Sequence, residues 1–328
     1  MQTKLQKELD ALITEDEHLK ESGNALEKTL AEIEIPLQII NECLYQRSKR
    51  QAVDLVHDAC EKSLLSELDT VKQAKEILNN VLAKVKSQIE HCKNIQTELE
   101  KDCNEKFQSM QIDKAAHELK ETSSGVAEYA WVERIQQNMS APEIWKSVSE
   151  RHLDRSQSHR AACRKLREHV VDVIRKVTQQ INDKWTETNA ALSQRVRETA
   201  EAKNQLQAEL DRVLNEIRLT ENTVADVKQA ITRQENSLML ARTRLALRQR
   251  RPNVELCRDD PHNRITLEVA EILETLEQLK NQLSTEQKVY QDLIYTRDQL
   301  ESDLAVKINT LQIDREKCLG IRKTRPMK

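Results

Sequence analysis

Apolar residues recur along most of the chain at alternating spacings of three and four residues. Between residues 5 and 44, ten of the twelve positions in this pattern are Leu or Ile, and only Asp16 and Gly23 interrupt it. A repeat of 3.5 residues keeps one stripe of a helix facing a partner helix, as in a left-handed coiled coil. The sequence therefore predicts a first coiled-coil helix over 1–46, with a kink at Pro36, whose ring removes a backbone donor.

The same pattern predicts three further long helices. Ten of the twelve corresponding positions between 64 and 103 are Leu, Val, Ile or Cys, and the repeat is clear again over 206–248 and 265–321. The expected elements are a second coiled-coil helix over 52–122, a linker with a short helix over 123–140, a long central helix over 141–248, and a C-terminal helix over 261–321 that precedes a tail over 322–328.

A short loop over 249–260 is predicted between the last two helices. Asp260 followed by Pro261 is typical of an N-cap and a first helical residue. Short connections place consecutive helices side by side and antiparallel. The predicted fold class is all-α, an elongated coiled-coil rod of long antiparallel helices joined by short loops. The apolar pattern is compatible with pairing within one chain or between chains.

Composition agrees with thin helical seams rather than a thick core. The chain is 38% hydrophobic and 33% charged, and it has three Trp, four Tyr and one Phe, although aromatic residues carry much of the buried area of compact domains. A net charge of −3 provides no field that favours DNA or an anionic membrane. We expect no nucleic-acid partner and no membrane association, because a basic stripe, an apolar span and a signal-peptide core are all missing from the sequence. A soluble protein of the cytoplasm is expected.

The sequence shows no pattern typical of catalysis or metal binding. Three glycines in 328 residues cannot build a phosphate-binding loop, and the seven cysteines lack a CxxC pair, so reduced thiols are expected. His57 and Cys60 are spaced like two metal ligands on a helix, but no further ligand accompanies them. We expect no enzymatic activity, no cofactor and no metal. The Glu and Asp residues are interpreted as solvated helix faces, and Trp131 and Trp145 as side chains that clamp helices near the central linker.

The candidate interaction site is the segment RPNVELCRD in the predicted loop. Its residues are Arg251, Pro252, Asn253, Val254, Glu255, Leu256, Cys257, Arg258 and Asp259. Val254, Leu256 and Cys257 offer an apolar face, and the flanking side chains carry both signs of charge. Such a loop could dock on a partner, or it could be a helix-reversal turn whose apolar residues pack on their own helices.

An excess of arginine surrounds this loop. Seven Arg lie between residues 242 and 264, against Glu255, Asp259 and Asp260. Arginines are favourable near the C-terminus of a helix, where the dipole is negative. They also pair well with carboxylates on an acidic partner surface. Both uses remain open from the sequence.

The segment RPNVELCRD matches the nonapeptide signature of the tektin family at every position. The segments TRLALRQR at 243–250, IEIPLQIINECLYQR at 33–47 and DLVHDACEKSLL at 54–65 also resemble tektin segments in corresponding places. The resemblance implies a filament-forming structural protein of ciliary and flagellar doublet microtubules, a microtubule inner protein that lies end to end along tubulin and supports motility. It also implies that the nonapeptide lies at filament contacts.

The implied partners are tubulin in the lumen of the doublet, other microtubule inner proteins, and other tektins, either copies of the chain or paralogues, end to end and laterally. The implied location is the axoneme of the cilium or flagellum, within the cytoskeleton. The apolar repeat begins almost at Met1, without the head region of a full-length tektin, as expected of a short member or of part of a longer protein. The alternative function is a soluble cytosolic coiled-coil adapter that recruits a partner through a helix groove.

Overall fold

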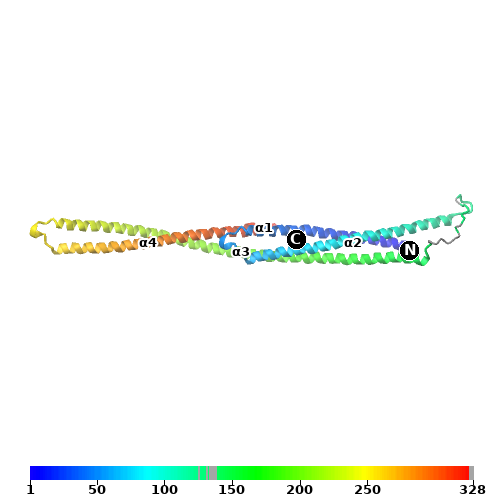
Figure 1. Cartoon of the computed structure of the whole chain (residues 1–328), viewed down its shortest axis with the longest axis horizontal. Coiled ribbons are helices and arrows are strands. Elements are labelled where there is room, and N and C mark those ends of the chain that lie inside the picture. Colours follow the sequence, from blue (N-terminus) through cyan, green and yellow to red (C-terminus); the bar gives the residue numbers. More distant parts are fainter. Residues whose placement is uncertain (125, 131, 133–138, 325–328) are drawn as a thin grey trace. The chain divides into compact units, whose positions relative to one another are not determined.

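The computed structural model describes residues 1–124, 126–130, 132 and 139–324, and every regular element among them is helical (Figure 1). The predicted all-α fold class is thereby confirmed for this part of the chain. Four long helices dominate: α1 (Gln2–Arg47), α2 (Ala59–Glu118), α3 (Pro142–Arg248) and α4 (Asp260–Gln312). The short elements are the 3₁₀ turns η1 (Ala52–Asp54) and η2 (Asn253–Glu255), the π-helix η3 (Ile313–Cys318) and α5 (Leu319–Arg322).

The ends of the helices differ in places from the predicted ones. α1 continues through Pro36 to Arg47, and the kink at Pro36 stays a prediction. α2 ends at Glu118, because Leu119 has an extended backbone with ψ of 132°. Residues 126–130 and 132 are not helical, which is reasonable because a helix this short needs packing to be stable. The rest of the predicted short helix, including Trp131 and residues 133–138, lies outside the described residues.

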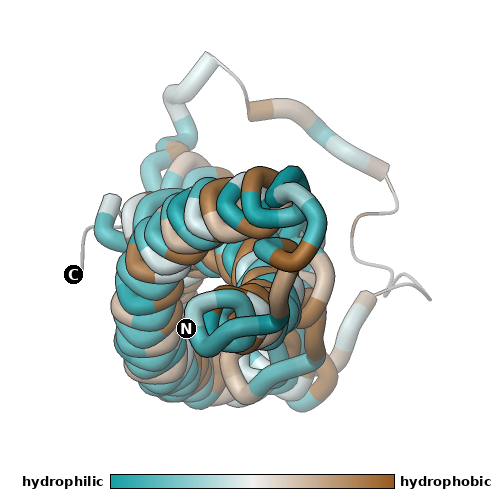
Figure 2. Tube along the Cα trace, turned by 90° about the vertical axis from the view of Figure 1, so that its left-hand side faces the viewer, coloured by the Kyte–Doolittle hydropathy of each residue, from teal (hydrophilic) through white to brown (hydrophobic). Residues whose placement is uncertain are grey.

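The chain divides into two compact units. Unit 1 contains Met1–Tyr45, His57–Ala191 and the chain from Ile321, and unit 2 contains Gln46–Val56 and Leu192–Gly320. α3 contributes its first part to unit 1 and its second part to unit 2. Figure 2 shows that hydrophobic residues recur at short intervals between hydrophilic ones along the helices, as the predicted repeat requires.

Unit 1 is a bundle of three helices, in which α1, α2 and the first part of α3 pack together (Figure 1). Lys86 of α2 pairs with Glu27 of α1 at 2.9 Å, and Gln88 of α2 contacts the Cys163 sulfur of α3 at 3.6 Å. Many apolar residues of the predicted seams are fully buried, as are several residues of α3. They include Leu5, Leu12, Leu19 and Leu26 of α1, Leu64, Leu78 and Leu99 of α2, and Cys163, Val170 and Val177 of α3.

Two buried carboxylates fix how α3 lies on α1 in unit 1. Glu8 accepts hydrogen bonds from Nε and Nη2 of Arg160 at 2.8 and 2.9 Å, and Glu15 accepts one from Arg167 at 2.7 Å. The two pairs are seven residues apart on both helices, so α3 runs parallel to α1. Neither Glu8 nor Glu15 is solvated, and the interpretation of the acidic residues as solvated faces is wrong for both.

Unit 2 is built on the antiparallel pair of α3 and α4. The hydroxyl of Tyr290 donates to Glu221 at 3.0 Å, and Lys280 lies 3.7 Å from Glu235. Most seam residues of α4 are only half-buried, although Leu276 and Leu304 are buried. A pair of helices covers one face of each seam, whereas three helices enclose it, and this explains the lower burial in unit 2.

Candidate interaction loop

The nonapeptide forms most of the loop that reverses the chain between α3 and α4. Its backbone is extended at Pro252, where ψ is 145°, and then makes the 3₁₀ turn η2. Asn253 begins this turn with φ of 43°, in the left-handed region that asparagine tolerates better than most residues. The turn leaves the Val254 side chain in solvent.

Asp259 holds the two ends of this loop together. Its side chain caps α4 by accepting a hydrogen bond from the His262 backbone N–H at 3.1 Å. Arg248, the last residue of α3, donates to the same carboxylate, and so does Arg251, at 3.1 Å. The predicted N-cap, Asp260, was wrong by one residue: Asp260 is the first helical residue, because the carboxylate that reaches the His262 N–H belongs to Asp259.

The arginines also determine the charge state of Asp259. Desolvation acts to raise the pKa of Asp259, but hydrogen bonds from Arg248, the His262 backbone and Arg251 outweigh it and lower the pKa to about 2. The carboxylate is therefore ionised throughout the neutral range. Arg248 and Arg251 serve the loop itself, whereas Arg258, which donates to Asn263 at 3.1 Å, is exposed.

The apolar residues of the loop lie in solvent. Val254 is 92% exposed and Leu256 is 57% exposed, and Cys257 is the exposed one of the seven cysteines. Packing of these side chains on α3 and α4 is therefore not observed, and docking on a partner stays a prediction. Glu255 is exposed as well, and it makes no ion pair with any described residue.

The other residues that the sequence singled out form no site. His57 contacts Glu61 at 2.7 Å and Cys60 is buried; among the described residues no group of three His, Cys, Asp or Glu side chains could hold a metal ion. Trp145 lies over the ammonium group of Lys106 of α2, 4.6 Å from the ring centre. Trp131 lies outside the described residues. In the described part of the chain, no helix is both long and apolar enough for a bilayer.

A second loop, at the joint that the sequence left between the predicted helices over 1–46 and 52–122, has the same backbone. It comprises residues 47–56 and follows α1 as the nonapeptide follows α3. We call it the first loop, and we call residues 248–259 the signature loop. Each residue of the first loop corresponds to the residue 201 positions later, as Arg47 does to Arg248. Ala52 at φ 48° corresponds to Asn253 at φ 43°.

The hydrogen bonds of the two loops correspond one by one. Leu55 N–H donates to the Ala52 carbonyl at 3.1 Å, as Leu256 N–H does to the Asn253 carbonyl at 3.1 Å. Val56 N–H donates to the Asp54 carbonyl at 3.0 Å, as Cys257 N–H does to the Glu255 carbonyl at 2.9 Å. The helices that follow begin with the equivalent caps Asp58 and Asp259. Both loops also expose an equivalent pair of apolar residues: Val53 and Leu55 in the first, Val254 and Leu256 in the second.

The surroundings of the two loops differ. The first loop packs against the C-terminal end of α4 in unit 2, where Asp54 is buried and accepts a hydrogen bond from Lys307 at 2.5 Å. Arg195 of α3 lies 3.6 Å from the same carboxylate. Arg47 donates to the buried Asp314 at 2.5 Å. The signature loop has no comparable contact with the described residues outside its own helix ends.

The spacing of 201 residues extends far beyond the loops. The seam of α1 from Leu5 to Leu44 falls on the seam of α3 from Leu206 to Leu245, and the seam of α2 from Leu64 falls on that of α4 from Ile265. The segment SMQIDK at 109–114 corresponds to TLQIDR at 310–315. Comparing the sequence with itself at a spacing of 201 residues would have revealed this repeat. Considering the seam of each helix separately did not reveal it.

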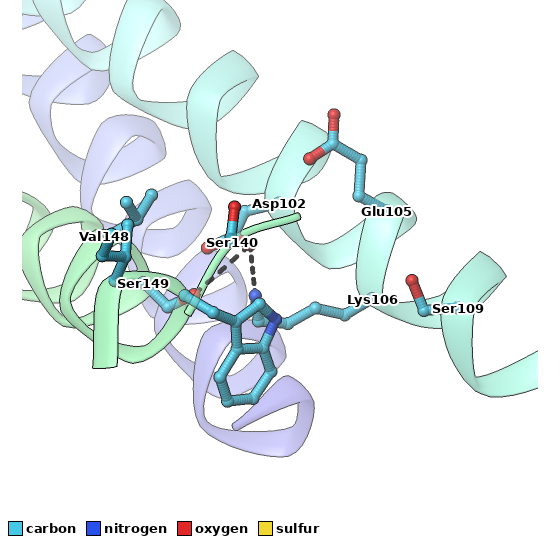
Figure 3. Close-up of a pocket in the computed structure, with 9 residues that line it drawn as sticks. Asp102, Glu105, Lys106, Ser109, Ser140, Val148 and Ser149 are labelled. Atoms are coloured by element: carbon cyan, nitrogen blue, oxygen red, sulfur yellow. Dashed lines mark hydrogen bonds and ion pairs between the residues drawn. The ribbon is translucent and has the colours of Figure 1, made fainter. Parts of the chain in front are cut away.

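A pocket lies beside the SMQIDK segment in unit 1. It is lined by Asp102, Lys106 and Ser109 of α2 and by Ser140, Trp145 and Ser149 near the start of α3, among others. Figure 3 shows the Lys106 side chain reaching Asp102 next to Ser149, with Val148 at the border. Lys106 donates to Asp102 at 2.7 Å. Hydrogen bonds from Lys106, His152 and Ser149 overcome desolvation and lower the pKa of Asp102, so the carboxylate is ionised.

Comparison with known proteins gives a consistent result across the chain. Residues 1–326 match the tektin family. The chain is 32% identical to tektin-4 of Bos taurus over 320 residues, which cover 98% of this chain and 72% of that protein. It is 32% identical to tektin-4 of Rattus norvegicus and 30% identical to tektin-4 of Xenopus laevis, each over 324 residues, with 99% of this chain and 72% and 73% of those proteins covered.

Proposed function

The chain belongs to the tektin family, and we propose that it is a microtubule inner protein that assembles end to end along tubulin in doublet microtubules. As a tektin it is a structural, coiled-coil protein of the cytoskeleton of cilia and flagella. The finer role is to stabilise and space the doublet and thereby to support the motility of the cilium or sperm flagellum. Its proposed partners are tubulin in the doublet lumen, other tektins end to end and laterally, and other microtubule inner proteins.

One observation supports this proposal above the others: the apolar residues of the signature loop lie in solvent while the loop itself is firmly held. Val254 and Leu256 are exposed, yet Arg248 and Arg251 clasp Asp259 at the base of the loop. Exposed apolar side chains on a preorganised loop lose little conformational freedom on binding, which favours association. The loop is therefore suited to a contact between neighbouring molecules of a filament.

The proposal is tested by replacing the apolar tip in the full chain. We expect the double variant Val254→Ser/Leu256→Ser to fold with unchanged helicity but to be lost from axonemes washed with detergent and salt. Leu267→Ser is the matched control, because Leu267 of α4 is also 57% exposed but lies outside the loop. Retention of the tip variant in washed axonemes would contradict the proposed docking role. Loss of the unaltered chain under the same washes would instead favour a soluble adapter.

A further inference from the structure

The guanidinium group of Arg322 is buried between α2 and α3 in unit 1. Arg322, the last residue of α5, is 2% exposed, although an arginine is almost never fully buried unless it is paired. From Leu319 to Thr324 it is the one buried residue, and Lys323 and Thr324 are exposed. This segment is therefore anchored by a single side chain.

Three residues of unit 1 contact this guanidinium in different ways. Glu67 of α2, which is fully buried, forms an ion pair with Nη1 at 3.0 Å and accepts a hydrogen bond from Nη2 at 3.1 Å. The side-chain oxygen of Asn189 of α3 accepts a hydrogen bond from Nε at 2.6 Å. Cζ lies 3.7 Å from the centre of the Trp185 ring, and the Trp185 backbone carbonyl accepts from Nη2 at 3.2 Å. We call Glu67, Trp185 and Asn189 the guanidinium site.

The guanidinium site fits a planar guanidinium better than an ammonium group. The two carboxylate oxygens of Glu67 face the two terminal nitrogens of Arg322, which is the fork-shaped pairing that guanidinium groups make with carboxylates. The face of the Trp185 ring stacks on the same cation. Trp185 and Asn189 are four residues apart on α3 and share one face of that helix. The site is thus built on α2 and α3, whose own seams are buried along unit 1.

We propose that the guanidinium site is a binding site for an arginine side chain, which Arg322 fills within the chain and which an arginine of another protein can fill when Arg322 leaves. A segment with few buried residues opens more readily than the core, so the segment from Leu319 to Thr324 acts as a removable plug. Its departure leaves the buried Glu67 carboxylate without this cation, which is costly. A second guanidinium removes that cost. The inference is independent of the proposed function, because it concerns unit 1 of a single chain.

Uptake of a small guanidinium by the emptied site tests this inference. In the full-length Arg322→Ala variant, ethylguanidinium should bind with a Kd of about 1 mM in isothermal titration calorimetry, because it supplies the group that the substitution removes. N-acetylarginine amide, which presents this group as a protein residue does, should bind about equally well. Ethylammonium has the same charge but lacks the planar fork, so it should bind about tenfold more weakly or less. The unaltered chain should also bind ethylguanidinium about tenfold more weakly or less, because the tethered Arg322 competes for the site.

Thermal unfolding provides a second measurement. Arg322→Ala should lower the melting temperature by about 5 °C, because the buried Glu67 loses its guanidinium. Ethylguanidinium at about ten times its Kd should restore about half of that loss, and ethylammonium should not. If Arg322→Ala is unfolded, ethylguanidinium should restore its helicity and ethylammonium should not, and a failure to do so would contradict the inference.

The matched control removes the carboxylate together with the guanidinium. The double variant Glu67→Gln/Arg322→Ala leaves no charge buried at the site, so it should melt at a higher temperature than Arg322→Ala. It should also bind ethylguanidinium about tenfold more weakly or less, since the charge-assisted pair is gone. Arg212→Ala should bind no ethylguanidinium, because Arg212 and its partner Glu209 are both more than half exposed and enclose no site.

Three results would overturn the inference. A folded Arg322→Ala variant that binds no ethylguanidinium would show that the site closes when it is empty. Equal binding of ethylguanidinium and ethylammonium, or no binding of N-acetylarginine amide, would show that the site does not recognise arginine. Equal binding to the unaltered chain would show that the ligand binds elsewhere. None of these results bears on retention in axonemes, so the proposed function is tested separately.

Discussion

Replacing Arg160 by alanine tests how the third helix of unit 1 is held. Arg160 donates two hydrogen bonds to the buried carboxylate of Glu8, at 2.8 and 2.9 Å. In the Arg160→Ala variant this carboxylate keeps only the hydroxyl of Ser156, which donates to it at 2.8 Å. A buried carboxylate that loses its cation is costly, because it keeps little of its hydration.

The size of the effect follows from burial. Removing one partner of a fully buried pair costs about 3–5 kcal/mol. The Arg160 side chain is 24% exposed and that of Glu8 is 7% exposed, so water can partly replace the guanidinium. We therefore expect a loss of about 2–3 kcal/mol in the free energy of unfolding. Glu8→Gln should cost less, about 1 kcal/mol, since the amide still accepts hydrogen bonds and no charge is left buried.

Urea unfolding followed by far-UV circular dichroism measures these differences. Arg212→Ala is the matched control: Arg212 pairs with Glu209, the residue equivalent to Glu8, but both side chains are more than half exposed. Its loss should be at most about 0.5 kcal/mol and should shrink with added salt, because exposed pairs are screened. If Arg160→Ala costs no more than Arg212→Ala, the clamp between α1 and α3 does not stabilise unit 1 and the reasoning is refuted.

Three further predictions concern the loops and thiols. The pKa of Asp259 is lowered from 3.8 to about 2. The Asp259 carboxylate should therefore stabilise the start of α4 fully above about pH 4, and this stabilisation should be lost as the pH falls through 2. Titration of the Asp259 carboxyl by NMR measures the pKa, and a midpoint near 4 would contradict the prediction. In the native chain only the Cys257 thiol should react with a maleimide, since the other six cysteines are buried. Burial also raises the pKa of Cys92 to about 12. Two or more labels per chain in mass spectrometry would contradict the burial of the other six cysteines. Ala52 has φ of 48°, where a Cβ is strained, so Ala52→Gly should stabilise the chain by about 0.5–1 kcal/mol in urea unfolding, and a lower stability would show that the strain is absent.

The helices themselves could be predicted from the sequence because their signal is local and repeated. Most positions at alternating spacings of three and four residues in α1, α2 and the second part of α3 are apolar, and no other regular structure buries that pattern. The N-cap of α4 was harder to predict than the helix itself, because Asp259 and Asp260 both precede Pro261 and both are suitable N-cap residues. The choice depends on Arg248 and Arg251, which reach Asp259 only once the loop has folded.

The burial of polar side chains could not be predicted from local sequence patterns. Glu8 and Glu15 lie beside the seam of α1 and look like surface residues in a pair of helices. They become buried because a third helix, α3, covers that flank of unit 1 and supplies Arg160 and Arg167. The equivalent residues of Glu8 and Glu15 in unit 2, Glu209 and Glu216, are exposed. Sequence alone does not state which pair of helices receives a third.

The internal repeat gives the exposed nonapeptide a physical interpretation that its composition alone does not. Two loops with one backbone should bury similar surfaces in similar ways, and the first loop does so within the chain, where Asp54 and Arg47 meet Lys307 and Asp314. The signature loop keeps equivalent charges in Arg248 and Glu255, whereas the apolar pair is exposed in both loops, at 68% and 57% for Val53 and Leu55 and at 92% and 57% for Val254 and Leu256. A repeat that pairs its charges within the chain at one loop and leaves the equivalent Glu255 exposed at the other can fold as a single copy and still offer the second loop to a partner.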